Sequence, residues 1–251
     1  MDFKALGPIQ VVNDRLAYTP SAPKVKQVLA LLVMRANQIV SLESILDELW
    51  GEALPRTAVT TAQTYIYQLR KDFIEKMGVD PKERLIVTAP PGYLLHTPEA
   101  SLDTHHFVRL ADQVQACHAA HDADGTIRWA EEALALWRGI PLADVPCGRT
   151  LRDYVSNLGE RRVCIHKLRI QAAMDLGRYG ELITDLRSLV MEHPYDEWFH
   201  AQLMLALGKA GRRGEALHVY HKVRRLLREE LGLDPSQDLQ RVQEEVLKSA
   251  S

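Results

Sequence analysis

An amphipathic stretch from residue 57 to residue 77 constrains the fold of this chain most strongly. Its apolar side chains recur every three or four residues and share one helical face: Val59, Ala62, Ile66, Leu69 and Phe73. The opposite face is polar and consists of Thr60, Thr61, Thr64, Tyr67, Gln68 and Lys71, with Gln63 and Arg70 on its flanks. No Asp or Glu occurs from Thr57 to Lys71. The pattern predicts a helix with one buried side and one side available to a partner.

The polar side of this predicted helix suits DNA. Short hydroxyl and amide groups can donate and accept hydrogen bonds at base edges, and Arg70 and Lys71 suit phosphates. For an isolated helix, an ordinary solvated face is the more common explanation, because surface helices are normally polar on one side. The neighbouring elements must therefore decide between the two interpretations.

Those neighbours favour a DNA-binding fold. Two β-rich runs surround Asn13-Asp14, helices are predicted over 21–38 and 41–51, and a hairpin is predicted over 85–95 with its turn at Pro90-Pro91-Gly92. The order of sheet, three helices and hairpin is typical of a winged helix-turn-helix, whose third helix enters the major groove.

The first of these helices offers a second set of candidate contacts. Pro23 fits its first position, so Lys24 and Lys26 lie at the helix start. Free backbone N–H groups and the helix dipole favour a phosphate there, and two lysines reinforce this preference. Solubilising surface charge is an equally good explanation for each lysine.

Charge and composition bound the possible functions. The 251 residues carry a net charge of −2, and residues 1–98 have 11 Lys+Arg against 10 Asp+Glu. Tight DNA binding would therefore need locally clustered positive charge and several copies or a partner protein. No apolar run is long enough to span a membrane and the first residues do not look like a signal peptide, so we expect a cytoplasmic protein.

The composition shifts at Thr97-Pro98-Glu99 to Ala, Leu, His and Arg, which predicts a domain boundary between 1–98 and 99–251. Residues 177–181, GRYGE, recur as GRRGE at 211–215, a spacing of 34 residues that is typical of tetratricopeptide helix pairs. A weaker copy, DADGTIRWAEEAL, lies at 122–134. The predicted fold is mainly α: an N-terminal α+β winged helix-turn-helix followed by an all-α tetratricopeptide-like helical domain.

Other chemistry finds little support in the sequence. The histidine pairs His118/His121 and His218/His221 have a helical spacing but no third ligand, and the three cysteines form no C-x-x-C pair. No phosphate-binding loop or G-x-S-x-G motif occurs. We therefore expect no metal site, no cofactor and no enzymatic activity.

The N-terminal segments LWG (49–51), TYIYQLRK (64–71) and IVTAPPGYLL (86–95) resemble OmpR-type DNA-binding domains, in particular those of Streptomyces antibiotic regulatory proteins. The resemblance implies base contacts from Thr60, Thr61, Thr64, Tyr67 and Gln68, flanked by Gln63, and phosphate contacts from Arg70, Lys71 and the wing near Thr88. Many members of the wider class have a basic residue at the wing tip. This chain has Ala89 followed by prolines, so insertion of an arginine into the minor groove is not implied.

The helical half resembles the bacterial transcriptional activation domain of the same regulators at 133–146, 192–220 and 228–240. Taken together, the resemblances imply a nucleoid-associated transcriptional activator that binds direct repeats at or beside the promoter −35 region. They further imply side-by-side self-association, contacts with RNA polymerase through its sigma subunit, and control of an antibiotic gene cluster. Structural roles in loops and helix packing are implied for Trp137, Arg138, Gly139, Asp144 and Pro194.

Two alternatives remain open. The chain could be a tetratricopeptide-type adaptor for a peptide, which its weak net charge favours and the acid-free face from Thr60 to Lys71 disfavours. It could also be an effector-gated regulator that binds a small molecule in the helical half. No residue pattern in the sequence favours or disfavours this alternative.

Overall fold

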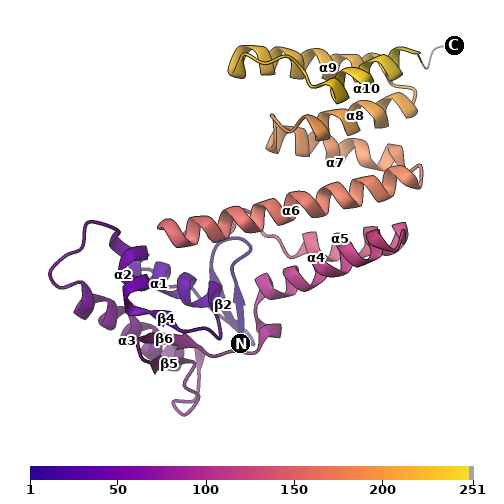
Figure 1. Ribbon diagram of the computed structural model, residues 1–251. Helices are drawn as coiled ribbons and strands as arrows, with labels where there is room; N and C mark the ends of the chain where they lie inside the picture. The colour runs from indigo at the N-terminus through magenta and orange to yellow at the C-terminus, as the bar shows by residue number, and fades with distance from the viewer. Residues whose placement is uncertain (249–251) are drawn as a thin grey trace. The chain divides into compact units, whose positions relative to one another are not determined.

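The computed structural model describes residues 1–248 and begins with a three-stranded antiparallel sheet (Figure 1). The strands β1 (Asp2–Lys4), β2 (Gln10–Asn13) and β3 (Leu16–Tyr18) are neighbours in that order. The turn predicted at Asn13-Asp14 is confirmed, because β2 and β3 pair across it with Asn13 opposite Leu16.

Three helices follow, as the sequence predicts: α1 (Pro23–Met34), α2 (Leu42–Trp50) and α3 (Ala58–Met77). Pro23 is the first residue of α1, where a missing N–H costs no hydrogen bond. Ser41 caps α2, since its hydroxyl oxygen accepts a hydrogen bond of 3.0 Å from the N–H of Ser44. All three helices contribute side chains to one apolar core.

The buried face of α3 differs from the prediction at one position. Ala62, Ile66, Leu69 and Phe73 are buried as expected, but the prediction for Val59 was wrong, since 45% of this residue is exposed. Ala58, one helical turn before Ala62, is buried in its place. The buried stripe of α3 follows Ala58, Ala62 and Ile66, which are four residues apart, and Val59 lies at the edge of this stripe in the first turn.

A second antiparallel sheet contains the wing, which is the hairpin of β5 (Ile86–Ala89) and β6 (Gly92–Leu95). A short strand that was not predicted, β4 (Val40–Ser41), pairs with β6, so the strand order is β4-β6-β5. Glycine is required at position 92, because a Cβ atom there would lie 1.9 Å from the carbonyl oxygen of Val40.

The remainder of the described chain is helical, which confirms the predicted fold class. Its elements are η1 (Glu99–Ser101), α4 (Asp103–Ala119), α5 (Ala123–Ala135), α6 (Arg149–Asp175), α7 (Tyr179–Glu192), α8 (Glu197–Lys209), α9 (Arg213–Leu226), η2 (Leu227–Leu231) and α10 (Gln237–Lys248). Each repeated segment contains the turn before α7 or α9 and the first residues of that helix, and Gly177 and Gly211 in these turns adopt φ of 72° and 75°. None of the described helices is long and apolar enough to cross a membrane.

The described chain packs into two compact units, one formed by residues 1–116 and 128–166 and the other by residues 117–127 and 167–248. In the second unit, α8 contacts α7, α9 and α10. In the first unit, the core that holds the three N-terminal helices also includes Leu102, Leu142, Val145 and Leu151. The domain boundary at residue 98 stays a prediction, and packing within the first unit continues across it.

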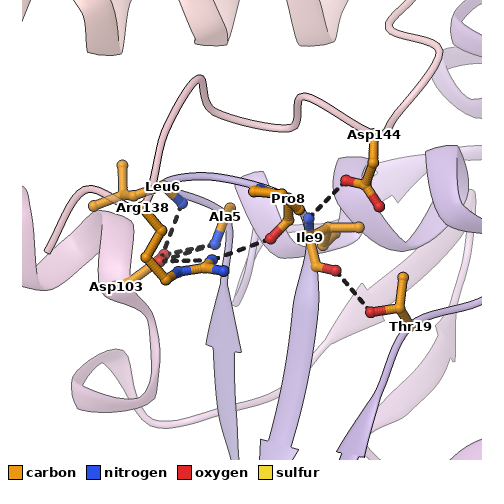
Figure 2. A network of polar contacts seen from close by, with 8 residues as sticks. All are labelled: Ala5, Leu6, Pro8, Ile9, Thr19, Asp103, Arg138 and Asp144. Atoms are coloured by element: carbon orange, nitrogen blue, oxygen red, sulfur yellow. Dashed lines mark hydrogen bonds and ion pairs between the residues drawn. The ribbon is translucent and has the colours of Figure 1, made fainter.

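Polar contacts join the same parts of the first unit (Figure 2). The Asp103 carboxylate accepts hydrogen bonds of 2.8 Å from the N–H of Ala5 and 3.0 Å from that of Leu6, and Arg138 donates one to the carbonyl of Pro8. We call Asp103, Arg138 and Asp144 the junction network. Burial raises the pKa of Asp103 above its ordinary value, although its backbone hydrogen bonds act in the opposite direction.

A further carboxylate, from the predicted DNA-binding half, accepts hydrogen bonds from the helical half. Glu48 of α2 is buried and accepts hydrogen bonds from the backbone N–H groups of Gly148, at 2.6 Å, and Leu151, at 3.2 Å. These groups lie at the start of α6, so a helix of the predicted DNA-binding half caps a helix of the other half.

Candidate nucleic-acid interface

The predicted base-facing side chains of α3 lie together on its solvent side. Tyr67 is the most prominent of them, with 67% of the residue exposed. Thr61 is half-buried, and the others are exposed: Thr60, Gln63, Thr64 and Gln68. The structure therefore brings together the whole set that the sequence assigned to base contacts.

The first acidic residue of α3 is kept away from this face. Asp72 is buried and accepts a 2.5 Å hydrogen bond from the hydroxyl of Tyr18, while Lys76 lies 2.9 Å from its other oxygen. Burial, followed by the nearby Asp72 carboxylate, raises the pKa of Tyr18 above its ordinary value, so this hydroxyl remains a donor. The exposed side of α3 up to Lys71 thus has no carboxylate to repel phosphates.

The hydroxyl group of Thr64 already has one partner. It donates a hydrogen bond of 2.9 Å to the carbonyl oxygen of Thr60, one turn earlier. Its oxygen retains a free lone pair, so Thr64 can accept a hydrogen bond from a base amino group without a change of rotamer.

Arg70 connects α3 to the wing. Its Nε donates a 2.9 Å hydrogen bond to the carbonyl of Ile86, its Nη2 donates a 2.8 Å bond to the hydroxyl of Thr88, and its guanidinium lies 5.7 Å from the ring centre of Tyr93. The structure therefore brings together Arg70 and Thr88, two residues that the sequence assigned to phosphate contacts. The contact with Tyr93 was not predicted from the sequence, where the only indication of it is an aromatic residue in the return strand of the hairpin.

Lys71 remains accessible at the end of the polar face. Its ammonium group lies 3.8 Å from the carboxylate of Glu75 one turn later, and both side chains are more than half exposed. Exposed pairs of this kind contribute little stability, so Lys71 can exchange Glu75 for a phosphate at low cost.

Lys24 and Lys26 are more constrained than the sequence suggested. Lys24 donates a hydrogen bond to the carbonyl of Leu49 and lies 5.8 Å from the ring centre of Trp50. Lys26 is largely buried and lies 2.7 Å from the carboxylate of Asp144 in the junction network. Their assignment to phosphates stays a prediction, and a phosphate would have to compete with these partners.

Asp144 also accepts a 2.8 Å hydrogen bond from the N–H of Ile9. Burial alone would raise the pKa of Asp144, but its hydrogen bonds with Lys26 and Ile9 outweigh burial and lower this pKa below its ordinary value. Among residues 1–248, no three His, Cys, Asp or Glu side chains are grouped so as to hold a metal ion.

Two family models match the chain, and they cover its two halves. Residues 19–95 match the model described as "Transcriptional regulatory protein, C terminal", and residues 102–247 match "Bacterial transcriptional activator domain".

Individual relatives agree with these matches. Regulatory protein DnrI of Streptomyces peucetius is 34% identical over 99% of this chain and 93% of its own length. Regulatory protein AfsR of Streptomyces coelicolor is 33% identical over 98% of this chain, which corresponds to 24% of the longer relative.

A solved structure is also similar. Mycobacterium tuberculosis EmbR in complex with a low-affinity phosphopeptide superposes with a TM-score of 0.86 at 32% identity, covering 99% of this chain and 65% of that one. The winged fold, the exposed face of α3 and the two family matches agree with one another. The chain belongs to the Streptomyces antibiotic regulatory protein family of DNA-binding transcriptional activators.

Proposed function

We propose that the exposed side of α3 enters the major groove of promoter DNA and reads its base edges. Thr60, Thr61, Thr64 and Gln68 supply donors and acceptors of the kind that distinguish base pairs in that groove, and Tyr67 supplies an apolar ring edge with a hydroxyl group. Gln63, on the flank of this side, supplies a further amide. The observation that carries this proposal is that these side chains, all exposed except the half-buried Thr61, share one helix face without a carboxylate among them.

Lys71 contacts phosphate in this arrangement, and the wing near Thr88 lies against the sugar-phosphate backbone. Arg70 supports the wing through its bonds to Ile86 and Thr88, and its remaining N–H groups contact phosphate. Lys24 and Lys26 make weaker phosphate contacts, since both already hold partners within the protein.

Several copies act together on one promoter. With a net charge of −2, one chain neutralises few phosphates, so tight binding requires copies bound side by side on tandem direct repeats. The repeats lie at or beside the −35 region, where the bound proteins contact RNA polymerase through its sigma subunit. The regulated genes are an antibiotic or other secondary-metabolite cluster, a proposal supported by the similarity to DnrI.

Fluorescence anisotropy with duplex DNA separates this function from that of a peptide adaptor. We expect saturable binding that weakens steeply between about 50 and about 200 mM salt, because bound phosphates release counterions. A chain that binds no duplex, or binds without a salt slope, would be an adaptor instead.

Lys71→Ala sharpens the same test. It should weaken binding to all sequences and lower the salt slope by about one unit for the phosphate contact that is lost. Lys209→Ala is a matched control, because Lys209 also lies 3.8 Å from a glutamate and its side chain is 54% exposed, against 52% for Lys71. Equal slopes for both variants would remove Lys71 from the interface.

A further inference from the structure

A groove in the second unit offers a ligand site that DNA binding does not use. Its volume is about 790 Å³, and it is lined by residues of α7, α8, α9 and η2 and by the loop at Pro194. This volume lies within the range of known small-molecule sites. Much of the lining is aliphatic, as at Val190, Leu203, Val219 and Leu226.

One apolar side chain of the groove is conspicuously exposed. Met191, at the end of α7, is 78% accessible, which is the largest exposed fraction among the large hydrophobic residues of the described chain. An unbranched thioether on the rim of an aliphatic groove adapts readily to a ligand of irregular shape. The apolar part of the groove therefore favours an occupant with an apolar body.

The charges along the groove favour an anion. Arg187 and Glu215 neutralise each other at 2.5 Å, and Arg212 also pairs with Glu215. Lys222 and Arg225 are exposed lining residues without an ion-pair partner among residues 1–248. Apart from the paired Glu215, Glu229 is the single carboxylate among the lining residues, so positive charge is in excess. Two unpaired cations beside an aliphatic surface complement a carboxylate or sulfonate attached to an apolar group.

A buried histidine, His200, forms part of the lining. His200 is 6% exposed, and its Nε2 lies 3.0 Å from the carbonyl oxygen of Pro194, which can only accept, so Nε2 carries the proton. Burial lowers the pKa of His200 below its ordinary value, and the neutral ring leaves Nδ1 as an acceptor. Within the described residues, Nδ1 has no hydrogen-bond partner and is shielded from solvent, so a ligand in the groove meets the apolar part of this ring.

We propose that this groove binds a small organic anion with an apolar body, whose acidic group pairs with Lys222 and Arg225. The site is separate from the exposed side of α3, and the proposal does not depend on the function given above. A ligand that meets these requirements carries an apolar ring or chain and one acidic group.

Two dyes of closely similar shape test this assignment on the full chain. Anilinonaphthalene sulfonate carries an apolar ring system, an N–H and one negative charge, and N-phenylnaphthylamine has the same rings and N–H without the charge. We expect the sulfonate to bind saturably with one molecule per chain and to weaken with added salt, and the neutral dye to bind more weakly.

Substitutions locate the site. The double variant Lys222→Ala, Arg225→Ala should weaken sulfonate binding about tenfold, as for the loss of two partly exposed ion pairs, and leave the neutral dye unchanged. Arg224→Ala is the matched control, because Arg224 is an exposed arginine of the same helix that does not line the groove. Circular dichroism confirms that each variant is folded.

Several outcomes would overturn the proposal. They are the absence of saturable sulfonate binding, equal affinity for both dyes, and an equal effect of Arg224→Ala and the double variant. Loss of dye binding with retained DNA binding would leave the proposed function intact, and the reverse result would leave the groove intact, so the two proposals fail separately.

Discussion

Two buried polar side chains differ in how completely their hydrogen bonds are satisfied. Asp72 has Tyr18 and Lys76 as partners and holds the buried side of α3 in place. His200 has a partner for Nε2 and none within the described residues for Nδ1. The first therefore stabilises the fold without a ligand, whereas the second leaves one hydrogen bond unmade.

The lowered pKa of His200 predicts a pH dependence of stability. Below about pH 6.5 the unfolded chain binds a proton at this residue more readily than the folded chain does, so the contribution of His200 to stability is complete above that pH and is lost as the pH falls. His200→Gln keeps a donor for Pro194 and removes the titration. Between about pH 7.5 and about pH 5.5, we expect the melting temperature of the wild type to fall further than that of the variant, by up to about 3 °C.

Differential scanning fluorimetry measures this difference. His218→Gln is the control for the replacement of a histidine by glutamine, because His218 is an exposed histidine of the adjacent helix α9. The same pH dependence in wild type and His200→Gln would show that His200 is not the residue responsible. The charged groups that act on His200 are Lys222, Asp196 and Glu197.

At the scale of elements, α3 and the wing behave as one reading surface because Arg70 joins them. Its two hydrogen bonds reach the carbonyl of Ile86 and the hydroxyl of Thr88, so the distance between helix and hairpin is fixed by a planar guanidinium. A residue with the same charge and a different shape could not make both bonds.

Arg70→Lys tests this role. The positive charge remains, so the salt slope of DNA binding should be unchanged, while affinity should fall about fivefold because the wing loses two hydrogen bonds. Anisotropy titrations at several salt concentrations give both quantities. Full affinity in the lysine variant would mean that Arg70 acts only as a charge.

The elements with a strong local pattern were predictable from the sequence. The three N-terminal helices, the hairpin and the repeated turns at Gly177 and Gly211 follow from periodicity and turn residues. The strand β4 was not predictable, because two residues are too few to show alternation, and the exposure of Val59 depends on packing at the first turn of α3. The candidate base-facing set was predictable as a helix face.

The intramolecular partners of Lys24 and Lys26 were not predictable from local sequence patterns. Lys26 pairs with Asp144, which is 118 residues away in the sequence, and Lys24 binds the carbonyl of Leu49. Local pattern carries no information about such partners, since they depend on how distant elements pack. The same limit applies to Glu48, whose carboxylate caps the start of α6.

At the scale of the whole molecule, the winged domain does not complete its own core. Leu102, Leu142, Val145 and Leu151 are buried in the same cluster as the three N-terminal helices, and the junction network satisfies backbone N–H groups at Ala5, Leu6 and Ile9. Burial of one such side chain stabilises by about 1.5 kcal/mol or more, so loss of all four is comparable with the total stability of a typical domain.

A fragment of residues 1–98 should therefore unfold without a cooperative transition or aggregate, whereas a fragment of residues 1–176 should melt cooperatively. Circular dichroism on heating distinguishes these outcomes, and the full chain provides the reference. A stable, cooperative 1–98 fragment with unchanged DNA affinity would show that the junction contributes little.

Selection of binding sites from a random duplex pool tests whether the exposed side of α3 reads base pairs. The wild type should enrich directly repeated sequences. Gln68→Ala should lose its base preference at one position in each repeat, a loss of about 1–3 kcal/mol of discrimination. The control Gln113→Ala, at an exposed position of α4, should select the same sequence as the wild type. Identical preference at every position in the wild type and in Gln68→Ala, and likewise in Thr64→Ala, would contradict the claim.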